Sequence, residues 1–237
     1  ERHALPDGAR KGFSMTDSIS RDDAIKFLCD ADLESLTRAQ RAEQLDCMLR
    51  EDWESDPSWK TIPADIRAEF ENDGDEDHEI EQPSDEKYDP VLRLWLRWRY
   101  SGARNEFLVA QLRNHGCDYQ QVIGEPALLV ACPCCGRCTL DQHGDYDICP
   151  VCWWEDSGQD NHNAEMTGGP NGRLSLTCGR INYLTSGISE PSRDDLRKLQ
   201  EPADKYPRGR IFVLSDDGRS VSEPSADWRD SLDNEAN

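Results

Sequence analysis

The sequence of 237 residues contains no apolar run of about eighteen residues, the length that a membrane-spanning helix needs. Its first residues also lack the apolar core of a secretory signal, so we expect a cytoplasmic protein without membrane association. Basic residues are scarce, because 27 Lys and Arg stand against 48 Asp and Glu, for a net charge of −21. Nucleic acid is a polyanion, and this deficit therefore predicts no direct nucleic-acid binding.

Catalytic signatures are missing as well. The chain has no H-E-x-x-H motif, no glycine-rich phosphate loop and no Ser-His-Asp order. His143 and His162 lie near the cysteine-rich region, and we expect both to be solvent-facing loop residues rather than ligands or general bases. These absences predict a protein that is not an enzyme.

Two cysteine-containing turns are present instead, and each has Pro after its first Cys. They are Cys132-Pro133-Cys134-Cys135-Gly136 and Cys149-Pro150-Val151-Cys152, with thirteen residues between Cys135 and Cys149. Turns of this type, called knuckles below, direct two sulfurs to one point, and two of them complete a tetrahedral site. We predict a structural zinc bound by Cys132, Cys135, Cys149 and Cys152.

Other assignments of the cysteines stay open at this point. Cys134 or Cys138 could replace one of the four ligands, although we expect Cys134 to face away from the site. A redox dithiol is an alternative to a metal site, since a single C-x-x-C suits thiol exchange. Four further cysteines have no regular spacing, which argues against a disulfide framework and for a reducing compartment; they are Cys29, Cys47, Cys117 and Cys178.

The residues before the knuckles predict helices. Ser20 with Asp23 and Thr37 with Gln40 are spaced as capping boxes at helix starts, and Asp89 is placed to cap a helix that begins at Pro90. That helix carries an apolar stripe at Val91, Leu94, Trp95 and Trp98. Residues 69–89 contain eleven acidic residues, typical of a solvated linker or of an anionic surface for a basic partner.

The residues between the knuckles predict a hairpin from Arg137 to Ile148, turning at Gly144-Asp145, and a helix follows from Thr177 to Leu184. The fold class is therefore α+β, a helical N-terminal part followed by a small zinc-ribbon-like β domain with a short helix. The expected divisions are an extension upstream of a start at Met15 (1–14), a helical domain with the acidic linker 69–89 (15–124), a zinc-binding domain (125–190) and a C-terminal extension with one strand and a flexible acidic tail (191–237).

The chain resembles the cysteine-rich CPCC family over roughly residues 130–190. The resemblance rests on the first knuckle, Thr139-Leu140, the block from Tyr146 to Asp156, Gly168-Gly169-Pro170-Asn171 and Asn182-Tyr183-Leu184. It departs from the family at Arg137-Cys138 and Cys178. The resemblance implies a small zinc-binding domain without catalytic function, similar to immunity proteins encoded beside bacterial toxins.

The expected partner is therefore a cognate toxin. Because this protein is strongly acidic, we expect the toxin to be a basic nuclease, and we expect the protein to cover its nucleic-acid-binding or active site. The alternative is a zinc-ribbon adaptor in transcription or a regulatory protein-protein interaction module. Two sets of residues are candidates for the partner surface: Asp73, Asp75, Glu76 and Asp77 in the acidic stretch, and Trp153, Trp154, Glu155 and Asp156 beside the metal. A second interpretation is that both Trp residues simply pack on the ribbon.

Overall fold

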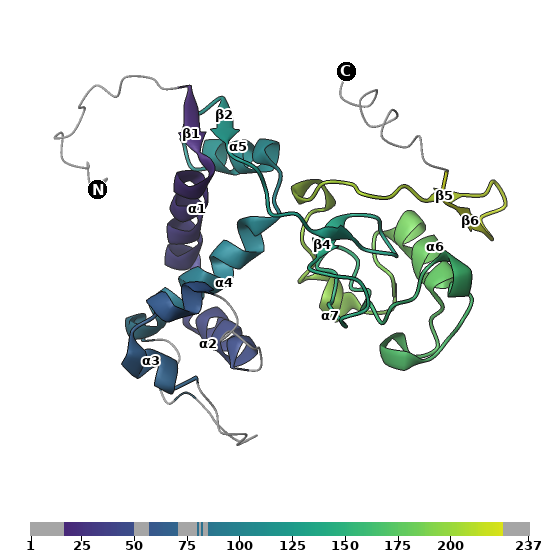
Figure 1. Cartoon of the computed structure of the whole chain (residues 1–237), viewed down its shortest axis with the longest axis horizontal. Helices are drawn as coiled ribbons and strands as arrows, with labels where there is room; N and C mark the ends of the chain where they lie inside the picture. The colour runs from purple at the N-terminus through teal and green to yellow at the C-terminus, as the bar shows by residue number, and fades with distance from the viewer. Residues whose placement is uncertain (1–16, 50–56, 71–79, 81, 83–84, 225–237) are drawn as a thin grey trace, which may run out of the picture. The chain divides into compact units, whose positions relative to one another are not determined.

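Helices dominate the first part of the chain, and short strand pairs occur with helices in the second (Figure 1). The computed structural model describes residues 17–49, 57–70, 80, 82 and 85–224. Two compact units are present: unit 1 contains 1–94 and 108–125, and unit 2 contains 95–107 and 126–237. In the described ranges, no helix is both long enough and apolar enough to cross a bilayer. The predicted α+β class is confirmed.

Unit 1 is built mainly from helices, and two short strands join its ends. Its helical elements are α1 (Arg21–Ser35), α2 (Arg38–Met48), α3 (Ala64–Ala68), the start of α4 (Asp89–Ser101) and most of α5 (Asn105–Asn114). Strand β1 (Ser18–Ser20) pairs in parallel with β2 (Gln121–Ile123). The Thr37–Gln40 capping box is confirmed in full, whereas at the first helix the Ser20 side chain accepts from the Asp23 amide as an N-cap without the reciprocal bond.

The predicted start and stripe of α4 are partly wrong. Asp89 already has helical backbone angles, and Asp85 instead caps the short 3₁₀ turn Glu86–Tyr88 that precedes α4. The Asp89 carboxylate forms an ion pair with Arg41. Trp98 is 50% exposed, because the two halves of α4 belong to different units and each half buries its own set of side chains; the buried residues are Val91, Leu92, Leu94, Leu96 and Tyr100.

Unit 2 contains two small antiparallel strand pairs and several helical segments. Its elements are β3 (Val130–Ala131), β4 (Cys138–Leu140), α6 (Leu176–Ser186), α7 (Asp194–Arg197), β5 (Val213–Leu214) and β6 (Val221–Ser222). Strand β3 pairs with β4, and β5 pairs with β6. Helix α6 covers the predicted helix. Leu184 at its predicted end is exposed, and the side that α6 buries carries Leu176, Gly179 and Arg180.

The predicted hairpin between the two knuckles is wrong. Strand β4, which follows the first knuckle, pairs with β3, which precedes it. The residues around the second knuckle behave in the same way, since Ile148 bridges Glu155 and the Cys149 amide donates to the Trp154 carbonyl at 2.9 Å. Each knuckle is thus the turn of its own hairpin, because a tight turn brings its immediate neighbours into register at the lowest cost in chain entropy.

The core of unit 2 surrounds the knuckles. Trp154 is fully buried and packs with the knuckle cysteines, Leu140, Val151, Leu176 and Tyr206. A Cβ at Gly179 would lie 3.0 Å from the Trp154 ring, so a larger residue there would force the ring or α6 to shift.

A buried ion cluster holds the later residues of unit 2. The Lys205 Nζ lies 2.7 Å from the Glu201 carboxylate, and Arg99 Nε donates to the same group at 2.6 Å. Lys205 and Glu201 are only 3% and 7% exposed. Since Arg99 lies in the second half of α4, the cluster joins this half of the helix to the last residues of the unit 2 core.

Candidate metal centre

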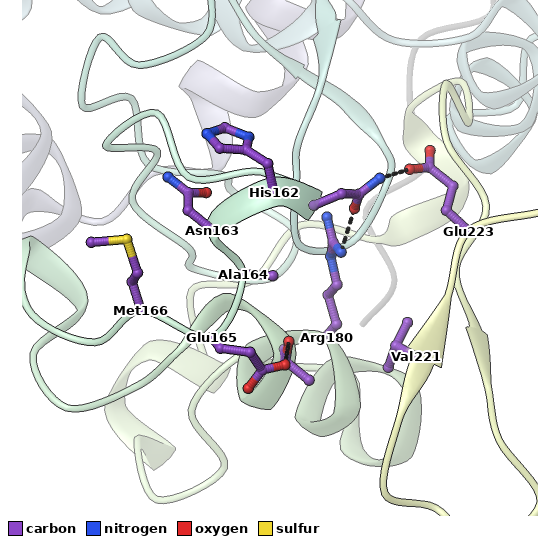
Figure 2. Close-up of a pocket in the computed structure, with 10 residues that line it drawn as sticks. His162, Asn163, Ala164, Glu165, Met166, Arg180, Val221 and Glu223 are labelled. Atoms are coloured by element: carbon purple, nitrogen blue, oxygen red, sulfur yellow. Dashed lines mark hydrogen bonds between the residues drawn. The ribbon is translucent and has the colours of Figure 1, made fainter.

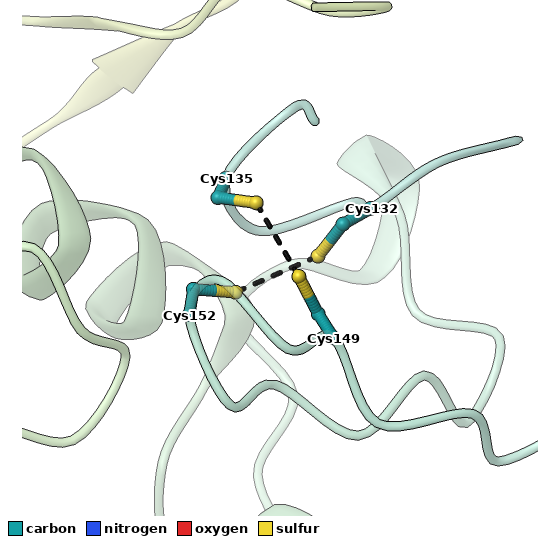
Figure 3. A group of neighbouring side chains, drawn as sticks. All are labelled: Cys132, Cys135, Cys149 and Cys152. Atoms are coloured by element: carbon teal, nitrogen blue, oxygen red, sulfur yellow. Dashed lines mark hydrogen bonds between the residues drawn. The ribbon is translucent and has the colours of Figure 1, made fainter. Parts of the chain in front are cut away.

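Four cysteine sulfurs converge at the centre of unit 2 (Figure 3). The ligand atoms of Cys132, Cys135, Cys149 and Cys152 all lie within 4.8 Å of one another, and all four residues are buried. Two contacts join the knuckles, with 3.6 Å between the sulfurs of Cys132 and Cys152 and 3.6 Å between those of Cys135 and Cys149. The structure therefore brings together the four predicted residues in the arrangement of a metal site.

The two knuckles share one backbone geometry. The Gly136 amide donates to the Cys132 carbonyl at 2.9 Å, and the Trp153 amide donates to the Cys149 carbonyl at 2.8 Å. The residue after the second Cys is left-handed in both, with φ of +76° at Gly136 and +62° at Trp153. A non-glycine residue in this conformation costs about 1 kcal/mol or more, so the second knuckle holds Trp153 in a strained position.

The electrostatics of the group favour a cation. Burial raises the pKa of Cys132 and of Cys152 well above the usual thiol range, because a buried thiolate loses its hydration. Four negative sulfurs this close would also repel one another, and a bound metal cation removes both penalties. Two donors already point at the sulfurs: the Thr139 hydroxyl lies 3.1 Å from Cys149 Sγ, and the Cys134 amide lies 3.4 Å from Cys132 Sγ.

Cys134 and Cys138 are not part of this group. Cys134 is fully buried, and its sulfur would lie 3.4 Å from a Cβ built on Gly179, which places it against α6. Cys138 is partly buried, and its sulfur would lie 2.7 Å from a Cβ on Gly209. Both thiols therefore pack against neighbouring segments of unit 2.

A buried arginine on α6, Arg180, holds the backbone of the first knuckle. Arg180 is 4% exposed, and its guanidinium donates to the Pro133 carbonyl and to Asn161 Oδ1, both at 2.7 Å. It also lies 4.1 Å from the centre of the Phe212 ring. This side chain therefore connects the first knuckle with the 3₁₀ turn Asn161–Asn163 and with the C-terminal residues of unit 2.

Arg180 also lines a pocket of about 360 Å³ (Figure 2). The acidic groups of this pocket already have partners, since Glu165 accepts from Thr177 at 2.6 Å and Glu223 accepts from Arg210 at 2.8 Å. Because both carboxylates already accept hydrogen bonds from protein groups, we interpret the pocket as a joint between segments and assign no ligand to it.

The other candidate residues are distributed unevenly. Trp154 and Asp156 are fully buried, so these two side chains are interior residues and not a surface that a partner can cover. The second interpretation, that the two Trp residues pack on the ribbon, therefore holds for Trp154. Trp153 and Glu155 are partly exposed, and His143 and His162 are exposed as predicted. The acidic candidates lie outside the described residues; they are Asp73, Asp75, Glu76 and Asp77.

Three supporting residues were not identified from the sequence. In the sequence, Thr139 stands out only through the family resemblance, Asp156 is expected on a partner surface, and Arg180 has no predicted role. The weak signal for Thr139 is that its hydroxyl lies only four residues after Cys135, a predicted ligand. Nothing local distinguishes Arg180, because its partners lie 47 and 19 residues earlier in the chain.

Comparison with known proteins agrees with this geometry. Residues 130–205 match the family model described as "Cysteine-rich CPCC". No curated protein and no solved structure matches the chain. The matched range contains both knuckles, helix α6 and the Glu201–Lys205 ion pair. Over this range the chain is therefore similar to the cysteine-rich CPCC family, as the resemblance predicts.

Proposed function

We propose that the four cysteines bind one zinc ion that stabilises unit 2. A tetrahedron with zinc–sulfur bonds of about 2.3 Å has sulfur–sulfur edges of about 3.8 Å, and two of the cross-knuckle sulfur–sulfur distances are 3.6 Å. Zinc is the metal that four-thiolate sites with paired C-x-x-C turns usually hold. Four protein ligands fill the usual coordination of zinc, so the metal would stabilise the fold and leave no position for a substrate.

We further propose that the protein is an immunity protein that binds and neutralises a cognate toxin in the cytoplasm. The observation that carries this proposal is the net charge of −21 on a chain with a cysteine-rich CPCC domain. The family resemblance suggests immunity to a toxin, and the charge suggests what kind. A basic nuclease carries a cleft that binds phosphate, and an acidic protein would be attracted to that cleft and cover it.

The proposed mechanism is occlusion rather than chemistry. Long-range attraction accelerates the encounter, and contacts at short range then keep nucleic acid out of the cleft. The rate of association should therefore fall as salt rises, because exposed charges are screened beyond about 8–10 Å at physiological ionic strength. An association rate that does not change with salt would contradict the electrostatic part of the mechanism.

Co-expression tests the function directly. The product of the neighbouring reading frame is expressed in a bacterial host with and without this protein, and survival and nucleic-acid integrity are measured. We expect protection by the intact protein, and weaker protection by a Cys149→Ser variant that lacks the metal site. Purified protein is also mixed with duplex DNA at low salt. Binding to DNA without protection would favour the transcription adaptor over the immunity protein.

A further inference from the structure

Two large apolar side chains lie exposed beside the second knuckle. Tyr146 is 61% exposed and Ile148 is 50% exposed, and a single residue separates them. The other large apolar side chains that are exposed in the described ranges lie at least five residues from one another along the chain. Isolated exposed apolar residues are normal, whereas a local pair in a fixed position is a feature of binding surfaces.

Acidic side chains surround this pair. Asp145 and Asp147 flank Tyr146, Asp141 donates its amide to the Asp147 carboxylate at 3.0 Å, and Glu155 lies opposite Ile148 in the hairpin. None of these four carboxylates forms an ion pair with a described residue. Their negative charge is thus not compensated within the described protein.

The charges are close enough to affect one another. Partial burial raises the pKa of Asp141, and the charges of Asp147 and Asp145 raise it further. Carboxylates that repel one another in the free protein gain when a cationic group comes between them. This surface is therefore better suited to a positively charged partner than to a neutral one.

The backbone that carries the apolar pair is fixed by a buried carboxylate. Asp156 is fully buried and accepts from the amides of Gly144 and Gly158 at 3.1 and 3.0 Å. The Tyr146 amide donates to the Asp156 carbonyl at 2.9 Å, and Tyr146 has a left-handed φ of +64°. A binding loop that is already ordered loses little entropy when it binds, which favours affinity.

We propose that Asp141, Asp145, Tyr146, Asp147, Ile148 and Glu155 form a docking surface, called the hairpin surface, for a Lys- and Arg-rich face of a protein partner. The proposal rests on the proposed function and names the part of the molecule that meets the basic toxin. The Tyr146 ring offers a face on which an arginine or lysine can stack, Ile148 supplies apolar contact, and the carboxylates pair with the surrounding cations. Asp156 acts as a positioning residue from inside the unit.

Photo-crosslinking in the cells that naturally make the protein tests this surface. The full-length chain carries p-benzoylphenylalanine in place of Tyr146, and a control chain carries it in place of Leu199, which is 55% exposed in the same unit. We expect position 146 to crosslink to a protein with a basic face, and position 199 not to do so. Zinc content and circular dichroism verify that both chains are folded.

Charge variants provide the matched control. Asp141→Lys with Asp145→Lys changes the net charge by the same amount as Asp194→Lys with Asp216→Lys, and all four residues are exposed in unit 2. We expect the first pair to weaken binding of the crosslinked partner by at least about tenfold, as the loss and reversal of two charge contacts implies. The second pair should change it by less than about threefold.

The outcomes distinguish a failure of the hairpin surface from a failure of the toxin as partner. A crosslink to the neighbouring toxin, lost in the first charge variant, supports both. A crosslink to a different basic protein, with the same dependence on Asp141 and Asp145, supports the hairpin surface and overturns the toxin as partner. No crosslink at position 146, a partner without a basic face, or equal effects of the two charge variants would overturn the hairpin surface, even if co-expression protects cells.

Discussion

Replacing Gly136 by alanine should destabilise unit 2 strongly. Gly136 has φ of +76°, and a Cβ at this position would lie 2.1 Å from the Arg210 carbonyl oxygen. The left-handed backbone alone costs an alanine about 1–2 kcal/mol. The clash must also displace the chain at Arg210, where the amides of Gly209 and Arg210 donate to the Gly136 carbonyl at 2.8 and 3.0 Å.

The backbone cost and the cost of displacing the Arg210 segment can be added, because they have different physical origins. Losing two backbone hydrogen bonds costs about 1 kcal/mol each, so the free energy of unfolding of unit 2 should fall by about 3–4 kcal/mol in Gly136→Ala. Gly187→Ala is the matched control, since Gly187 has φ of +79° and no atom within 4 Å of the added Cβ. The control should lose only the backbone cost of about 1–2 kcal/mol.

Hydrogen exchange measured on the peptide that contains residues 132–140 gives the local opening free energy of this part of unit 2. Free zinc is held at the same concentration for every variant, because a ligand bound to the folded state adds to its stability. Equal losses in Gly136→Ala and Gly187→Ala would refute the reasoning, since they would mean that the Arg210 segment does not press on the first knuckle.

Three further predictions concern the metal site and the ion cluster. Purified protein should contain about one zinc per chain, and Cys149→Ser should lose it while Cys134→Ser keeps it; a folded protein with no metal would contradict the assignment. Thr139→Val should weaken zinc binding by about tenfold in a chelator competition, because it removes the hydroxyl 3.1 Å from the Cys149 sulfur, and an unchanged affinity would show that this contact is incidental. Burial opposes ionisation of Glu201, but the charges of Lys205 and then Arg99 outweigh it and lower the pKa of Glu201. Its contribution to stability is therefore complete above the unfolded pKa of about 4.3 and is lost as pH falls through the lower folded pKa. The difference in unfolding free energy between the wild type and Glu201→Gln should shrink as pH falls through that range, and a difference that does not change with pH would contradict the assignment.

Local sequence patterns predicted the parts of the structure that local interactions determine. The caps at Ser20 and Thr37 need only the next three residues, and knuckle spacing alone selected the four cysteines. The hairpin was mispredicted because strand-forming residues and a Gly144-Asp145 turn are compatible with two pairings. The protein forms the second pairing, in which each knuckle is the turn between the two segments that flank it. The strand propensities of the residues do not distinguish this pairing from a hairpin between the knuckles.

Long-range packing explains the other differences. The helical period of α4 identified one apolar stripe, but no periodicity reveals that the two halves of the helix belong to different units, so Trp98 was placed inside. Arg180 and Asp156 are charged residues, and residues of this type are usually exposed. Their burial depends on acceptors and donors that only the tertiary structure brings to them.

The separate closure of the two knuckles has an evolutionary consequence. Residues 141–145 connect one hairpin to the other and contribute neither a metal ligand nor a strand pair. Substitutions and length changes in this connection therefore leave the ligand positions in place, as long as Asp156 still fixes its far end. A lineage under pressure to follow a changing partner can diversify this stretch rapidly while the same cysteines continue to hold the domain together.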